Sequence, residues 1–149
     1  MAAKDRFRLQ SGADLGEKMR HCLEELLAER YGKVLIVGSD SPTLPIERIT
    51  SAIEALEIAD VVLGPCEDGG FYLIGARKAD PRMFDAIPWS DGETRAQTVR
   101  AVKAVGLSVA EVGEWYDVDE PGGLDRLELD PSLPTSLQRW FAARSARLQ

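Results

Sequence analysis

Two short apolar segments, each ended by glycine, constrain the fold of this chain more than any other feature. Residues 33–38 and 60–64 contain uninterrupted runs of valine, leucine and isoleucine. Apolar and polar residues do not alternate in these runs. Such runs are typical of strands that are buried on both faces, as in a parallel sheet. Between them, residues 46–56 place apolar side chains on one helical stripe. The strand–helix–strand order therefore predicts an α/β fold with three layers (α/β/α) and a mostly parallel sheet.

The remaining periodicity predicts further elements in the same alternating order. Helices are expected over 14–30, 81–86, 93–105 and 134–148, with a helical turn after Pro121, and strands over 71–75 and 107–112. Asp14 is a candidate N-cap for the first helix, because Glu17 follows three residues later as in a capping box. The length of 149 residues predicts one domain, 1–149, with a C-terminal helix within 131–149.

The charge of the chain is acidic and unevenly placed. Its formal net charge of −7 argues against a general nucleic-acid binder, which needs a basic face to displace counterions. Residues 111–130 hold eight acidic residues and one basic residue, Arg126, so this segment alone accounts for the net charge. These carboxylates form either a solvated acidic surface or a group that collects around a cation.

The sequence also bears on compartment and redox chemistry. No apolar run approaches the roughly 18 residues that span a membrane, and the charged N-terminus lacks the apolar core of a secretory signal. We therefore expect a cytoplasmic protein. The two cysteines, Cys22 and Cys66, lack metal-ligand spacing and are expected to be structural thiols.

The first candidate site follows the strand predicted at 33–38 and reads Gly38-Ser39-Asp40-Ser41-Pro42. Open α/β sheets bind ligands at the carboxyl ends of their strands, and Asp40 comes at such an end. Gly38 allows close approach of a ligand, and Pro42 fixes the exit of the loop. A carboxylate there can hold Mg²⁺; equally, Asp40 can cap the helix that follows.

Two more acidic motifs follow other strands. Glu67-Asp68-Gly69-Gly70 is either a glycine-floored pocket wall or a tight turn, since Asp-Gly is a strong hairpin signal. Asp117 and Asp119 are two residues apart, so in an extended segment their side chains point to the same face. Together with Asp40 they can neutralise one divalent ion, or they cap the helical turn after Pro121. Trp89 belongs either to the core or to the acceptor side of a cleft.

Four blocks of the sequence carry a resemblance to a known family. They are 9–19, 37–44, Leu63-Gly-Pro-Cys-Glu-Asp-Gly-Gly-Phe-Tyr-Leu-Ile-Gly75 and Asp117-Val-Asp-Glu-Pro121, with Pro88-Trp89-Ser90 between the last two. The chain resembles, over residues 9–127, the bacterial GT-A-fold proteins known as radical-SAM/selenodomain-associated transferase 1. These proteins belong to the nucleotide-diphospho-sugar transferase superfamily.

The resemblance implies a metal-dependent transferase that uses a nucleotide-activated donor, of glycosyltransferase or nucleotidyltransferase type. It implies that Asp40 and Asp119 are catalytic and hold Mg²⁺ or Mn²⁺, with Asp117 as a neighbouring ligand. Gly38, Ser39, Pro42, Glu67, Asp68, Gly69, Gly70 and Trp89 are the implied substrate-binding residues. The implied partners are a nucleotide or nucleotide-sugar donor and a small-molecule acceptor.

The sequence departs from the family pattern in two places. Relatives begin with a strand and a basic, glycine-bearing loop that grips the nucleotide, whereas here only thirteen residues precede Asp14. This difference predicts an N-terminally truncated domain with an exposed sheet edge through which copies associate. In the last block, Glu120 stands where the family usually has threonine, and Gly122-Gly123 replace an acid pair. The alternative function is therefore a non-catalytic remnant or interaction module that has lost nucleotide binding.

Overall fold

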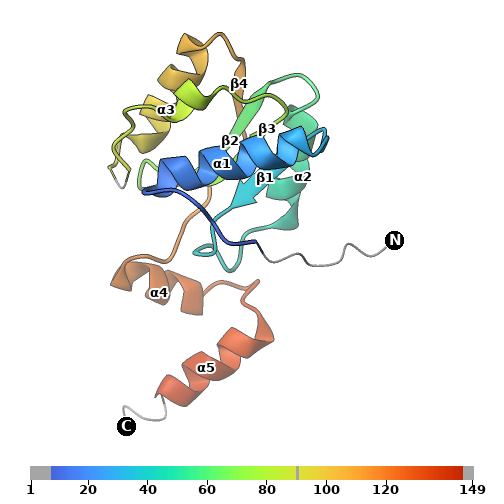
Figure 1. Ribbon diagram of the computed structural model, residues 1–149. Coiled ribbons are helices and arrows are strands. Elements are labelled where there is room, and N and C mark those ends of the chain that lie inside the picture. Colours follow the sequence, from blue (N-terminus) through green and yellow to red (C-terminus); the bar gives the residue numbers. More distant parts are fainter. Residues whose placement is uncertain (1–7, 90, 146–149) are drawn as a thin grey trace.

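The structure is a computed structural model that describes residues 8–89 and 91–145 (Figure 1). Its elements, in chain order, are α1 (Leu15–Ala28), β1 (Val34–Val37), α2 (Ile46–Ala55), β2 (Val61–Pro65), β3 (Phe71–Ala76), the 3-10 helix η1 (Pro81–Phe84), α3 (Thr94–Ala104), β4 (Val109–Glu111), α4 (Pro121–Glu128) and α5 (Thr135–Ser145). Every predicted element is present, with ends shifted by a few residues. The predicted extension of the last helix to 148 lies partly outside the described residues.

The four strands form one sheet in the order β1-β3-β2-β4. β3 pairs antiparallel with both β1 and β2, whereas β2 and β4 pair in parallel. Three strands thus run in one direction, as a mostly parallel sheet requires, but two of the three pairings are antiparallel. The expected parallel pairing of β1 with β2 is absent because β3 lies between them. Helix α2 connects β1 to β2, and β3 then returns from a tight turn after β2 and pairs with both strands.

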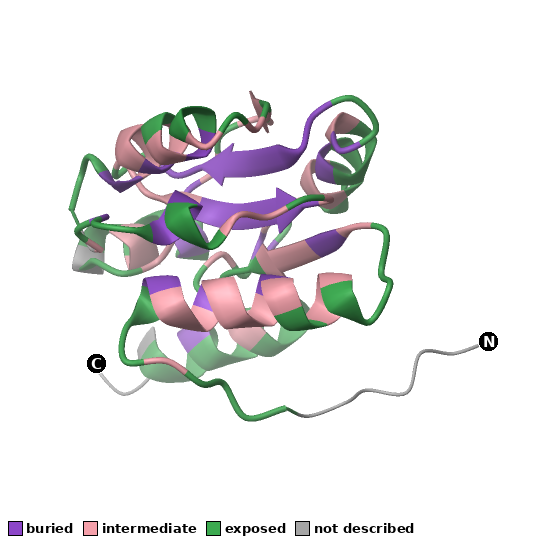
Figure 2. Cartoon of the chain, turned by 45° about the horizontal axis from the view of Figure 1, so that its top comes forward, coloured by how far each residue is buried: buried purple, intermediate pink, exposed green. Residues whose placement is uncertain are grey.

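Helices cover both faces of the sheet, so the predicted α/β/α layering is confirmed (Figure 2). On one face, Met19 and Leu23 of α1 and Val102 of α3 pack with Val61 and Leu63 of β2. On the other face, α2 packs against alternate strand residues through a second set of apolar side chains, Ala52, Leu56, Val62 and Leu73. Successive residues of β2 therefore enter opposite cores, which explains why its sequence does not alternate.

The first helix begins at the predicted N-cap, Asp14. The Asp14 carboxylate accepts from the backbone N–H of Glu17 at 2.8 Å, and the Glu17 carboxylate accepts from the N–H of Ala13 at 2.7 Å. The first bond satisfies a donor that the first helical turn leaves without an intrahelical partner, and the second reaches Ala13, one residue earlier than in a standard capping box.

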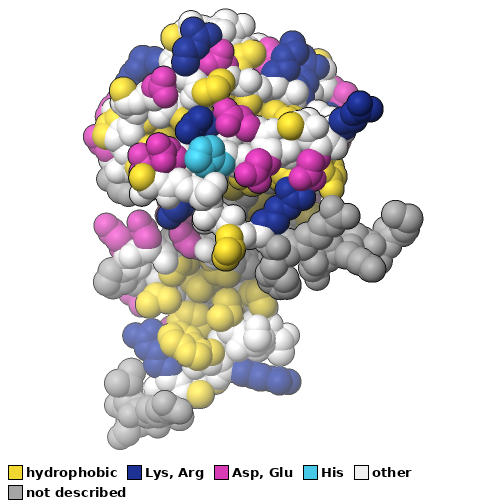
Figure 3. Space-filling model, viewed as in Figure 1, with side chains coloured by type: hydrophobic (Ala, Val, Ile, Leu, Met, Phe, Trp, Pro, Cys, Tyr) yellow, Lys and Arg dark blue, Asp and Glu magenta, His cyan; other side chains and the backbone are white. Residues whose placement is uncertain are grey.

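The C-terminal helices α4 and α5 pack on each other below the sheet (Figure 1). Their small core contains Leu127, Leu133 and Phe141, all buried, whereas the adjacent Trp140 is about half exposed. In the view of Figure 3, apolar side chains gather over these helices, while charged side chains of both signs cover α1. The segment between β4 and α4 starts at the edge of the sheet where β2 and β4 both end, and it leads from there to the C-terminal helices.

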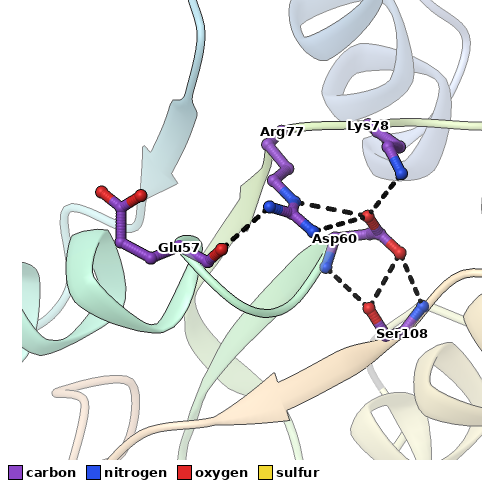
Figure 4. A network of polar contacts seen from close by, with 5 residues as sticks. All are labelled: Glu57, Asp60, Arg77, Lys78 and Ser108. Atoms are coloured by element: carbon purple, nitrogen blue, oxygen red, sulfur yellow. Dashed lines mark hydrogen bonds and ion pairs between the residues drawn. The ribbon is translucent and has the colours of Figure 1, made fainter.

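A polar network centred on the buried Asp60 carboxylate joins three strands at the opposite edge of the sheet (Figure 4). The Asp60 carboxylate accepts from the Ser108 hydroxyl at 2.8 Å and from its backbone N–H at 3.1 Å. The same carboxylate pairs with Arg77 and Lys78, and Arg77 also donates to the Glu57 carbonyl at 2.9 Å. These bonds fix the beginning of β2 against the end of β3 and the segment that leads into β4.

Among the described residues, no helix has the length and apolar character needed to cross a membrane.

Candidate functional site

Three loops meet at the sheet edge where β1, β2 and β4 end. The backbone N–H of Val118 donates to the Asp40 carbonyl at 2.9 Å, and the Ser41 hydroxyl donates to the Tyr116 carbonyl at 2.9 Å. The N–H of Trp115 donates to the Pro65 carbonyl at 3.0 Å. The structure therefore brings together the three motifs that the sequence placed at strand ends, because their strands share one direction.

The loop between β2 and β3 is a tight turn as well as a wall of this site. Cys66 and Gly70 pair across it, and the Asp68 carboxylate accepts from the Gly70 N–H at 2.8 Å. Gly69 adopts φ +90°, and a Cβ at this position would lie 1.9 Å from the carbonyl oxygen of Gly92. Only glycine fits there, for its backbone conformation and for the contact with the neighbouring loop.

An acidic cluster with one thiol lies where these loops meet. Cys66, Asp68 and Asp117 each place one potential ligand atom within 4.8 Å of the other two. Burial raises the pKa of Asp117, and the charges of Asp68 and Asp119 raise it further. Like charges held this close favour a cation, since a cation restores the ionised form of each carboxylate.

The thiol of Cys66 is a buried member of this cluster. Burial raises its pKa, and the negative charges of Asp117, Asp68 and Asp119 raise it further. A thiol in such surroundings stays protonated at neutral pH and is a poor nucleophile. Its hydrogen bond with Asp117 lowers the pKa of that carboxyl, against the effect of burial.

The predicted metal ligands are only partly members of this cluster. Asp117 belongs to it, whereas Asp40 and Asp119 lie outside the group defined by ligand-atom distance and are exposed. The Asp40 carboxylate accepts from the Ser39 hydroxyl at 2.8 Å. Asp40 and Asp119 as catalytic ligands stay predictions.

The predicted substrate-binding residues fall into two sets. Gly38, Ser39 and Pro42 are exposed on the loop after β1, and Asp68, Gly69 and Gly70 form the turn described above. Glu67 pairs with Arg126 of α4 at 2.6 Å. Trp89 packs elsewhere: its indole lies against Gly16 of α1 and near Phe84, so its contacts among the described residues are those of a core side chain.

Several residues of this edge were not predicted from the sequence. The Tyr116 hydroxyl donates to Asp130 at 2.7 Å and lies 2.8 Å from the Thr43 hydroxyl. The Arg126 guanidinium lies 3.9 Å from the centre of the Tyr116 ring while it pairs with Glu67. Arg126 is the one basic residue among the eight acidic residues of segment 111–130, and this feature of the sequence could have marked it as a candidate site residue. Cys66 gave a weaker signal, its two-residue spacing from Asp68.

Residues 2–91 match the model of a family described as "Uncharacterized protein conserved in bacteria (DUF2064)". A curated protein of Methanopyrus kandleri (strain AV19), named 2-phospho-L-lactate guanylyltransferase, is 35% identical over 96 residues, which make up 62% of this chain and 48% of that protein. A crystal structure from Desulfovibrio desulfuricans G20, provisionally assigned as a nucleotide-diphospho-sugar transferase, is 33% identical with a TM-score of 0.78. That match covers 90% of this chain and 62% of the solved chain. The chain thus spans about half the length of the curated relative it matches.

Proposed function

The chain belongs to the bacterial family DUF2064 and has the α/β fold of a nucleotide-diphospho-sugar transferase-like superfamily, and on this premise we propose that it transfers a group from a nucleotide-activated donor. The observation that carries the proposal is the acidic cluster of Asp68, Asp117 and Cys66 at the carboxyl edge of the sheet. This edge is where open α/β sheets bind their ligands. Donor phosphates are anions, so acids collected there imply a cation between protein and donor.

Mg²⁺ or Mn²⁺ is the proposed cation. Carboxylate oxygens suit these hard ions, and Asp68 and Asp117 supply two within reach of one another. Asp119 adds negative charge to the cluster, and Asp40 lies on the adjoining loop. The protonated Cys66 thiol is a poor ligand for a hard ion and is assigned the role of orienting Asp117. When bound, the ion would stabilise charge on the phosphate oxygens of the donor.

Nucleotidyl transfer is the form of the reaction that we favour. The name of the Methanopyrus kandleri relative specifies guanylyl transfer, and its match includes 62% of this chain. Glycosyl transfer uses the same kind of donor and metal. Comparing the binding of a nucleotide-sugar with that of nucleoside triphosphates therefore distinguishes glycosyl transfer from nucleotidyl transfer. The acceptor is proposed to be a small molecule.

The proposal is tested by thermal denaturation of the full chain with GTP, ATP, CTP, UTP and UDP-glucose, each with and without Mn²⁺. One nucleotide at about 100 times its dissociation constant should stabilise the chain by about 2.7 kcal/mol. For a chain of this length, that gain corresponds to a rise in Tm of roughly 5–10 °C. The rise should require Mn²⁺, because the carboxylates of Asp68 and Asp117 would repel donor phosphates placed directly on the cluster without a cation between them.

A chain whose Tm ignores every nucleotide, with and without metal, would contradict this function and favour the non-catalytic module. Stabilisation by UDP-glucose but by no nucleoside triphosphate would favour glycosyl transfer.

We also propose that copies of this chain associate through β1. Among the described residues β1 pairs with β3 alone, so its other edge is open, and Val37 at its end is 42% exposed. Open strand edges pair with other strands, and a lysine at the edge opposes this. Sedimentation velocity over a concentration series should show association that Val37→Lys weakens. The matched control is Ile58→Lys, an exposed position outside the sheet. A wild-type monomer at every concentration would refute the proposal.

A further inference from the structure

Two hydrogen-bond donors beside the acidic cluster are buried and have no acceptor among the described residues. They are Nε of Arg48, in the first turn of α2, and Nε1 of Trp115, in the segment after β4. The Arg48 guanidinium carbon lies 5.9 Å from the centre of the Trp115 ring. A buried donor without an acceptor costs free energy, so each such group calls for an explanation.

The surrounding residues hold Arg48 in this position. A Cβ on Gly113 would lie 1.7 Å from Nη1 of Arg48, so the guanidinium occupies the space that this glycine leaves free. The Gly113 carbonyl accepts from the Tyr72 hydroxyl at 2.8 Å, and the Tyr72 ring in turn fills the space beside Gly64. Glycines thus make room for both side chains.

The charge of Arg48 is unmatched. Within the described ranges, no carboxylate lies at ion-pair distance from it. Four other described arginines also lack such a partner, but all four are exposed to solvent, whereas Nε of Arg48 is buried; they are Arg30, Arg100, Arg139 and Arg144. The first turn of a helix adds partial positive charge of its own. An anion is therefore the ligand class that would satisfy both the charge and the two donors.

Trp115 places these donors next to the proposed metal cluster. Its backbone forms a parallel bridge with Cys66, and its ring packs in the same apolar cluster as Cys66 and Tyr72. A group bound by Arg48 and Trp115 would adjoin the loop that carries Asp68 and the segment that carries Asp117.

We propose that Arg48 and Trp115 bind an oxyanion, a phosphate or carboxylate group, of the acceptor substrate. The word acceptor rests on the proposed function, whereas the anion site itself does not. Oxygen atoms of such a group accept from Nε of Arg48 and Nε1 of Trp115, and its negative charge balances the guanidinium. The acceptor is accordingly an anionic small molecule, held beside the donor phosphates.

The test is calorimetric titration of the full chain with inorganic phosphate and, separately, with malonate, in the absence of metal and nucleotide. The stronger ligand identifies the oxyanion as phosphate or carboxylate. Arg48→Gln should weaken its binding about tenfold or more, and Trp115→Phe, which removes only the N–H donor, about threefold to tenfold. Trp140→Phe on α5 is the matched control and should bind as wild type.

Gly113→Ala provides a second, independent variant, because it displaces the Arg48 side chain without removing a functional group. It should weaken anion binding as Arg48→Gln does, and thermal denaturation of each variant establishes that the fold is retained. The proposal is overturned if neither anion binds the wild-type chain, which is the result expected if a water molecule satisfies the two donors. It is also overturned if the Arg48→Gln and Trp115→Phe variants bind the anion as tightly as the wild type. If the chain binds the anion but binds neither nucleotide nor metal, the proposed anion site stands and only the proposed transferase function is refuted.

Discussion

Replacing Asp117 with asparagine should weaken metal binding at least about 100-fold and yet stabilise the metal-free protein. Asp117 is the half-buried member of the cluster with Asp68 and Cys66. Removing even an outer partner of a metal ligand typically weakens metal binding about 10–100-fold, so loss of a ligand should cost at least about 100-fold. The opposite effect on stability arises because the fold holds this carboxylate in unfavourable surroundings.

The direction follows from the raised pKa of Asp117, whose causes are burial and the charges of Asp68 and Asp119. At a pH below the ordinary aspartate pKa of about 3.9, the Asp117 carboxyl is neutral in both the folded and the unfolded protein. Its contribution to the free energy of unfolding is then most favourable. Stability is lost as the pH rises through the raised pKa, because the folded protein must then hold the charge. Asparagine cannot ionise, so the variant avoids this loss at neutral pH.

Mn²⁺ titration followed by calorimetry measures the first effect, and the Tm without metal measures the second. Asp125→Asn is the matched control, because Asp125 is an exposed acid of the same segment, on α4. A variant that binds Mn²⁺ like wild type would remove Asp117 from the site. A variant with weakened binding and a lowered Tm would instead indicate a structural defect.

The sequence predicted the layers of the fold better than the pairing of its strands. Unbroken apolar runs at β1 and β2 identify strands covered on both faces, whichever neighbour each strand has. They carry no information on the insertion of β3 between β1 and β2, which depends on packing across the sheet. The Asp68-Gly69 turn did hold that information, since a tight hairpin requires antiparallel pairing.

The candidate site divides in the same way. Asp68 and Asp117 were predictable as site residues, because each follows a strand whose carboxyl end lies at one common edge. Cys66 was assigned a structural role, because a single cysteine without a spaced partner resembles any buried thiol. The grouping of Arg48 with Trp115, and of Arg126 with Tyr116, joins segments far apart in the chain, and no local pattern specifies such contacts.

Replacing Asp60 with asparagine should destabilise the fold by about 2–4 kcal/mol, because hydrogen bonds to buried charges are costly to lose. The carboxylate is 12% exposed and connects Ser108, Arg77 and Lys78 at the beginning of the sheet. An amide keeps the size of the side chain but loses both ion pairs and one of its two acceptor oxygens. Urea denaturation at pH 7 measures the difference. The control is Asp80→Asn, which breaks a pair with the exposed Arg82 but keeps an oxygen that can cap η1, and it should change stability little.

The effect of Asp60→Asn should also depend on pH. Bonds from Ser108 and Lys78 hold the pKa of Asp60 well below its ordinary value. For a carboxyl with a lowered pKa, the stability it contributes is present above the unfolded value of about 3.9 and is lost as the pH falls towards the folded value. The advantage of the wild-type chain over the variant should therefore begin to shrink at about pH 4 and fall further as the pH is lowered. A difference that stays constant from pH 7 to pH 3 would show that Asp60 acts by shape and packing, and not by charge.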